Sequence, residues 1–223
     1  MLLANRPAGG DAAFMAHPVT TKPAMALRHA HAIQILMTAC GIDSFARTAF
    51  DARIRQLQRL GVPRRDDAIP TARIEYGIVE LASLATAVRL TAAFMVPSLA
   101  ARFVLERWTV LVPALIAGAR PSLPTDYVAR RSIGGATMIA IAAGALSDLG
   151  RQKRFDERYN GALGELVLID RVGLADTIDK LGGAGLVIDT ATYMPAIVTG
   201  FAAAAMPTSH ELAYELDRLR FFA

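Results

Sequence analysis

The residues from Ser44 to Leu60 carry the pattern that most constrains the fold of this chain. On a helix with about 3.6 residues per turn, four apolar side chains share one narrow stripe: Ala46, Phe50, Ile54 and Leu57. A helix with a single apolar stripe has to pack that stripe against a core. The pattern therefore predicts a helix docked on a globular domain with its opposite face in solvent.

The opposite face of this predicted helix carries small and hydrogen-bonding side chains. Its members are Thr48, Ala52, Arg55, Gln56 and Arg59. Arginine can donate two hydrogen bonds to guanine, glutamine can pair with adenine, and small residues allow close approach to a base pair. Such a face is typical of a helix that reads the major groove. The turn at Gly61 then ends the helix and presents Arg64 and Arg65.

Charge is distributed unevenly along the chain. The formal net charge of the 223 residues is only +4, which argues against a histone-like polycation. Between Arg47 and Arg73, however, seven arginines stand against three aspartates. This concentration of positive charge is expected where a protein contacts phosphate. The alternative interpretation is a solvated helix face that binds nothing.

The first half of the chain predicts a helix-turn-helix. Residues 1–26 are rich in Gly, Pro and Ala and are expected to form a flexible arm. Residues 27–112 are expected to form one domain, whose first helix runs from Leu27 to Cys40. Gly41 closes that helix, and Asp43 or Ser44 is placed to cap the next one.

A wing and two more helices complete the predicted domain. The segment from Pro63 to Tyr76 combines prolines and turn residues with a β-compatible end, which suits a short two-stranded wing. A third helix with one apolar face follows, from Leu81 to Ala92. Pro97 is expected to begin a fourth helix that runs through Trp108.

The order of these parts resembles the winged helix-turn-helix DNA-binding domain of the MerR superfamily. The matching pieces lie between Ile33 and about Leu111 and are Ile33–Ile42, Ile54-Arg55, Arg59-Leu60-Gly61-Val62, Tyr76 with Leu84, and Leu90 with Met95 to Leu99. The chain differs from the family by a longer spacing between Gly41 and Gly61, and by Ile74 and Glu75 in place of paired arginines. The resemblance implies a dimer on an inverted-repeat operator, with an effector or protein-interaction module downstream.

Residues 113–223 predict a C-terminal α/β domain for an effector or for dimerisation. The prolines between residues 111 and 124 place the domain boundary there. A helix is expected over 126–149. Two strand–Asp–helix units then follow about twenty residues apart, ending their strands at Asp170 and Asp189. Side by side they would form a parallel pair of buried strands, with both aspartates as helix N-caps, before a last helix over 211–222.

The fold expected from these patterns is mostly α-helical: a winged helix-turn-helix followed by a helical domain with a small βαβα element. We expect a cytoplasmic, bacterial-type transcription regulator that binds double-stranded DNA as a homodimer, with RNA polymerase as a further possible partner. The residues expected at base edges are Thr48, Arg55, Gln56 and Arg59. The residues expected at phosphates are Arg47, Arg53, Arg64, Arg65 and Arg73.

Patterns for catalysis, metals, cofactors and membranes are weak in this sequence. His29 and His31 lack the spacing of a zinc site, and the glycine-rich pieces lack the lysine of a phosphate loop. Prolines and glycines interrupt the uncharged stretch 190–209, so no membrane span is expected. We expect no enzyme, no cofactor and no metal, and a buried, unreactive Cys40.

Two alternatives stay open at this stage. One is a prophage-type or polymerase-associated factor whose helix-turn-helix binds protein. The other is a small-molecule sensor or enzyme built on the βα repeat, with a pocket beside Asp170 and Asp189.

Overall fold

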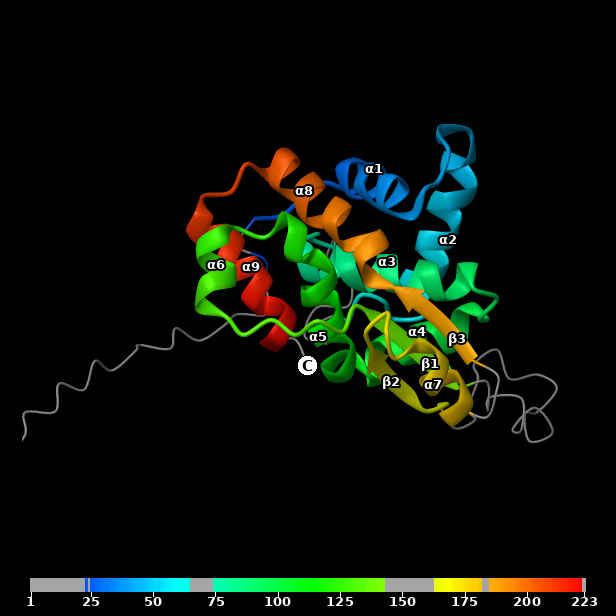
Figure 1. The fold of residues 1–223 in the computed structure, drawn as a ribbon. Coiled ribbons are helices and arrows are strands. Elements are labelled where there is room, and N and C mark those ends of the chain that lie inside the picture. Colours follow the sequence, from blue (N-terminus) through cyan, green and yellow to red (C-terminus); the bar gives the residue numbers. More distant parts are fainter. Residues whose placement is uncertain (1–22, 24, 65–73, 143–162, 182–184, 222–223) are drawn as a thin grey trace, which may run out of the picture.

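The structure, a computed structural model, describes residues 23, 25–64, 74–142, 163–181 and 185–221. Figure 1 shows a body of helices with a small sheet along one side. In chain order the elements are α1 (His29–Cys40), the 3-10 turn η1 (Ser44–Ala46), α2 (Arg47–Arg59), α3 (Ile78–Ala92), α4 (Pro97–Glu106), α5 (Trp108–Ala119), the 3-10 turn η2 (Arg120–Ser122), α6 (Thr125–Arg130), β1 (Met138–Ala142), β2 (Leu166–Ile169), α7 (Leu174–Lys180), β3 (Gly185–Asp189), the 3-10 turn η4 (Thr190–Thr192), α8 (Met194–Ala205) and α9 (Ser209–Phe221). The expected mostly helical fold with a small β element is confirmed at this level.

Helix α3 is the centre of the molecule. Its residues from Ile78 to Val88 are all buried, and it packs against α1, α2, α4, α8 and α9. The sequence had suggested one apolar face, but the helix is enclosed on all sides, and only its end at Ala92 is exposed. The polar residues on it are satisfied locally: the Thr86 hydroxyl donates to the Ala82 carbonyl at 2.7 Å and hydrogen-bonds the Tyr193 hydroxyl at 2.9 Å.

The first two helices follow the local sequence signals closely. α1 ends at Gly41, which takes a left-handed conformation (φ 68°) that a glycine adopts without strain. The Asp43 carboxylate then accepts a hydrogen bond from the Phe45 N–H at 2.9 Å and caps η1. The expected single helix over 44–60 is therefore divided into η1 and α2, and Ala46 is exposed where the stripe had placed it in the core.

The predicted wing falls mainly on residues 65–73, which lie outside the described residues. Arg65 and Arg73 lie outside them as well. At the end of the segment, Tyr76 forms an antiparallel bridge with Leu27, whose N–H donates to the Tyr76 carbonyl at 3.0 Å. This bridge joins the residues just before α1 to the residues just before α3.

The two halves of the chain share one hydrophobic core. Pro97 begins α4 as expected, but the helix ends at Glu106 and a separate helix, α5, starts at Trp108. α5 continues through Pro113, the position of the expected domain boundary, and packs against α8 and α9. The core thus runs without interruption from Leu27 to Leu219 among the described residues.

The sheet differs from the expected parallel pair. β1 lies in the middle and pairs antiparallel with both β2 and β3, so that the order is β2-β1-β3. β1 falls within the segment 126–149, where a helix had been predicted. In the described part of that segment, residues 126–142, only α6 is helical, and residues 143–149 lie outside the described residues. Ile139 and Ile141 favour a strand, and their burial in the central position is what selects it. β2 and β3 are at the edges and are only partly buried.

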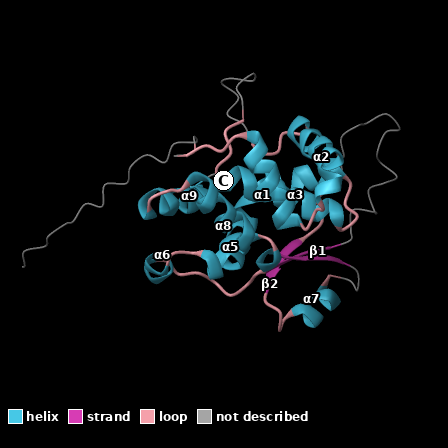
Figure 2. Ribbon diagram, turned by 90° about the horizontal axis from the view of Figure 1, so that it is seen from above, coloured by secondary structure: helices cyan, strands magenta, loops and turns pink. Residues whose placement is uncertain are grey.

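Helices cover one face of the sheet, and α7 lies on the other side of it (Figure 2). The uncharged stretch after β3 forms η4 and α8, and α8 buries Ile197, Val198 and Phe201 against the rest of the core. Among the described residues, no helix combines the length and the apolar character needed to cross a bilayer. The last helix, α9, packs Leu216 and Leu219 into the same core, as its spacing predicts.

Candidate nucleic-acid interface

Helix α2 is fixed to the body of the protein by the apolar stripe that the sequence identifies. Phe50 is 6% exposed, and Ile54 and Leu57 are 0% exposed. Burial of each such side chain contributes about 1.5–3 kcal/mol to folding. The helix contacts α1, α3 and α4 through this side. Its opposite side is consequently held outward in a fixed rotational position.

The outward side of α2 is dominated by arginine. Arg47, Arg53, Arg55 and Arg59 are exposed, and Thr48 and Ala52 lie exposed between them. Gln56, which was expected to be fully exposed, is partly buried. Arg64 is exposed just beyond the end of the helix.

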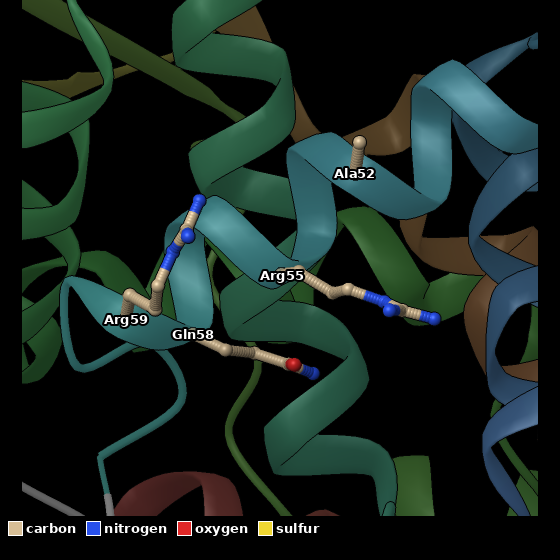
Figure 3. A pocket seen from close by; sticks show the side chains of 4 residues that line it. All are labelled: Ala52, Arg55, Gln58 and Arg59. Carbon is tan, nitrogen blue, oxygen red and sulfur yellow. The ribbon is translucent and has the colours of Figure 1, made fainter.

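An open hollow of about 620 Å³ lies on this outward side. Four residues from successive turns of α2 line it: Ala52, Arg55, Gln58 and Arg59 (Figure 3). Figure 3 shows the Arg55 and Gln58 side chains extending toward the same side, while Arg59 extends in a different direction. Ala52 is exposed and adds only a methyl group to the lining of the hollow.

The arginines of the outward side differ in how they are held. Arg55 pairs with the Asp51 carboxylate at 2.8 Å, one helical turn earlier, with its side chain 67% exposed. Arg53 donates to the Gln56 amide oxygen at 3.4 Å, and Arg64 donates to the Leu105 carbonyl at 3.4 Å. Arg59 makes no hydrogen bond or ion pair with any residue that the structure describes. Neither do Arg47 and Thr48, at the start of the helix.

A chain of hydrogen bonds connects α2 to Tyr76, just before α3, and to His29, the first residue of α1. The Gln58 amide donates to the Tyr76 hydroxyl at 2.8 Å, and the Tyr76 hydroxyl lies 2.9 Å from His29 Nδ1. His29 Nε2 lies 2.8 Å from Asp51. Every member is satisfied when His29 is neutral and carries its proton on Nε2, because the tyrosine then donates to Nδ1 and the imidazole to Asp51.

Asp51 is therefore shared between the body of the protein and its cationic surface. Partial burial by itself would raise the pKa of Asp51, but hydrogen bonds from His29 and Arg55 and the charge of Arg55 outweigh it and lower the pKa below its usual value. The carboxylate is ionised at neutral pH. It pairs with one guanidinium, while Arg47, Arg53 and Arg59 form no ion pair with an acidic residue in the described part of the chain.

The structure brings together six of the nine residues predicted for the interface. Arg47, Thr48, Arg53, Arg55 and Arg59 share the exposed side of α2, and Gln56 lies at its margin. Arg64 lies beyond the helix, next to the end of α4. Arg65 and Arg73 are outside the described residues.

Sequence reasoning missed the polar residues that support the interface. The pairing of Asp51 with Arg55 could have been read from their four-residue spacing on a helix, because oppositely charged residues at this spacing are neighbours. His29 and Tyr76 lie 22 and 25 residues from Asp51, so no local pattern connects them. Gln58 lies next to Arg55 on a helical wheel, but no local pattern connects it with Tyr76.

The other chemistry-bearing residues have structural roles. Asp170 accepts a hydrogen bond from the Gly173 N–H at 2.8 Å just before α7, and Asp189 accepts one from the Ala191 N–H at 3.0 Å in η4. Asp189 is the N-cap of η4, as expected, whereas the N-cap of α7 is Gly173 and not Asp170. Among the described residues no group of three or more His, Cys, Asp or Glu side chains is arranged to hold a metal ion. Cys40 is buried, and burial raises the pKa of its thiol to about 12.

Comparison with known protein families, curated proteins and solved structures finds no match for this chain.

Proposed function

We propose that this protein is a sequence-specific DNA-binding transcription regulator that uses the outward side of α2 as its recognition surface. The observation that carries the proposal is the set of exposed arginines on a helix whose other side is firmly buried. The one carboxylate on that helix is already engaged by His29 and Arg55. A phosphate backbone approaching α2 therefore meets net positive charge.

The dimensions of α2 suit the major groove. Its 13 residues span about 20 Å, and the groove of B-form DNA is about 12 Å wide and admits one helix. Arg55 and Arg59 are placed one turn apart and would contact base edges, with Thr48 and Gln56 at the margins. Arg47, Arg53 and Arg64 would contact phosphates and fix the register. Binding as a homodimer to an inverted repeat, as the resemblance to the MerR superfamily implies, belongs to the same proposal.

The Asp51 carboxylate would serve recognition by orienting Arg55. It accepts from one terminal nitrogen of the guanidinium and leaves other N–H groups free to donate. Tyr76 hydrogen-bonds His29, and His29 hydrogen-bonds Asp51, so the position of the carboxylate is fixed. Arg55, which pairs with this carboxylate, is therefore partly ordered before DNA binds. Ordering a long side chain in advance reduces the entropy cost of binding.

The proposal is tested by selecting duplexes from a random pool with the full chain and measuring affinity for the selected sequence. Arg55→Ala and Arg59→Ala should each weaken binding by about 1–3 kcal/mol and relax base preference. Arg130→Ala is the matched control for Arg55→Ala, because Arg130 also pairs with an aspartate one turn earlier, on the exposed helix α6. It should leave affinity unchanged. Failure to enrich any sequence, or equal losses in variant and control, would reject the proposal.

A further inference from the structure

Phe45 is an aromatic side chain left almost entirely in solvent beside the cationic surface. Its exposed fraction is 98%. Single exposed apolar residues are common in proteins and need no explanation on their own. The position of Phe45 is what gives its exposure meaning, because it lies in η1, two residues before Arg47, the first residue of α2.

The backbone that carries Phe45 is held in place. The Asp43 carboxylate accepts a hydrogen bond from the Phe45 N–H at 2.9 Å and is itself within 3.4 Å of the Ser44 hydroxyl. The Ala46 N–H donates to the Asp43 carbonyl at 3.0 Å and closes the turn. The phenyl group is thus presented from an ordered turn, and it contributes no buried surface to the hydrophobic core.

We propose that Phe45 is a specificity-determining residue that packs against the 5-methyl group of a thymine in the major groove. This inference rests on the proposed function of α2. Residues at the N-terminal end of a recognition helix are among those that contact base edges, and an apolar contact with the thymine methyl is one of the ways a protein reads that groove. Arg47 and Thr48, exposed two and three residues later, would hold this end of the helix against the DNA.

The contact has an energetic reason. The phenyl group of Phe45 adds no packing to the fold, since nothing in the described part of the chain covers it. Its apolar surface is buried only when a partner binds. Covering one methyl group contributes about 0.8 kcal/mol, which corresponds to about a four-fold change in affinity. The contact neutralises no phosphate, so it adds nothing to the salt dependence of binding.

The test compares the selected operator with versions in which each thymine in turn is replaced by deoxyuridine. Deoxyuridine lacks the 5-methyl group and keeps the base-pairing atoms. We expect one thymine in each half-site at which the replacement weakens binding of the unmodified protein about four-fold. Phe45→Ala should bind the thymine and deoxyuridine duplexes equally well, with an unchanged dependence on salt concentration.

Phe94→Ala is the matched control. Phe94 is 99% exposed, but it lies in the turn between α3 and α4 and not at the start of α2. This variant should keep the full penalty for deoxyuridine. A Phe45→Ala protein that keeps the penalty for deoxyuridine would overturn the inference. If its affinity for both duplexes were also lower by the same factor, Phe45 would contact the DNA somewhere other than at a thymine methyl.

The failure of this inference can be distinguished from the failure of the proposed function. If the unmodified protein binds its operator and Arg59→Ala weakens binding while Phe45→Ala behaves like Phe94→Ala, only the role of Phe45 is rejected. If the unmodified protein selects no duplex, the proposed function fails and the role of Phe45 fails with it.

Discussion

The arginines of this protein are used in two opposite ways. Arg218, on α9, has a side chain that is 0% exposed and is held between two carboxylates, Glu80 at 2.9 Å and Glu215 at 2.9 Å. Arg59, on α2, is exposed and has no partner that the structure describes. The comparison teaches that the number of arginines says little about function. What matters is whether the donors of each guanidinium are already used inside the protein.

The buried cluster joins the last helix to the start of the central one. The Gly77 N–H donates to Glu80 at 2.8 Å, and the Ile78 N–H donates to Glu215 at 3.2 Å. These N–H groups at the start of α3 have no backbone carbonyl of the helix to bond to, and the positive end of the helix dipole also favours the two carboxylates. Burial disfavours the charge of Arg218, but Glu80 and Glu215 outweigh it and raise its pKa.

Breaking the buried cluster should have the largest effect on stability. Arg218→Met removes the guanidinium and leaves two buried carboxylates without their counter-ion, which should lower the free energy of unfolding by about 3–5 kcal/mol. Urea denaturation measures this loss. Arg130→Met, which breaks an exposed pair, should change stability by less than about 1 kcal/mol. Equal effects of the two substitutions would mean that Arg218 does not hold α9 to α3.

Crowding the same cluster should have an intermediate effect. A Cβ atom at Gly77 would overlap Glu215 Oε2 and would lie 2.9 Å from the Pro23 Cβ. Gly77→Ala should therefore destabilise the protein by about 1–3 kcal/mol, since the neighbours have to move. Gly134→Ala is the control, because a Cβ there meets nothing within 4 Å. A Gly77→Ala protein as stable as the control in thermal unfolding would contradict the close packing at this helix start.

Removing the charge of Asp51 should have the smallest effect on stability, and that effect should be present at neutral pH and disappear in acid. The pKa of Asp51 is lowered in the folded protein, so the carboxylate contributes stability above its unfolded pKa of about 3.9 and loses it as the pH falls through the folded value. Asp51→Asn should cost less than about 1 kcal/mol at pH 7 and flatten the loss of stability below about pH 4. Unfolding measured from pH 2 to pH 7 checks this. If the Asp51→Asn protein lost stability below about pH 4 as steeply as the unmodified protein, the hydrogen bonds and ion pair of Asp51 would not contribute to stability.

The sequence predicted the parts of the fold that depend on near neighbours. The stripe of Phe50, Ile54 and Leu57 and the turn at Gly41 are set by spacing and by the conformational freedom of glycine, and both are confirmed. The sheet was mispredicted because its central strand, β1, is separated from its partners β2 and β3 by long stretches of chain. The repeat at Asp170 and Asp189 suggested two adjacent strands, and no local pattern showed that β1 lies between them.

The same limit applies to the candidate interface. Arg55 and Arg59 were predicted because they share one helix face, and both are exposed as expected. The supporting contacts of Asp51 with His29 and of Tyr76 with Gln58 join segments far apart in the sequence. The burial of α3 on all sides could not be predicted either, because α8 and α9, which cover it, come more than a hundred residues later.

The most direct test of the central claim maps which surface touches DNA. Ala52 lies between the arginines of α2, and Ala129 lies exposed on α6, at the opposite end of the molecule (Figure 1). Ala52→Cys and Ala129→Cys can each be labelled with an iron chelate that cleaves nearby DNA, because Cys40 is buried and its raised pKa keeps it unreactive. The account predicts cleavage confined to the selected operator from position 52 and none from position 129. Equal cleavage from both positions, or cleavage from 129 alone, would contradict it.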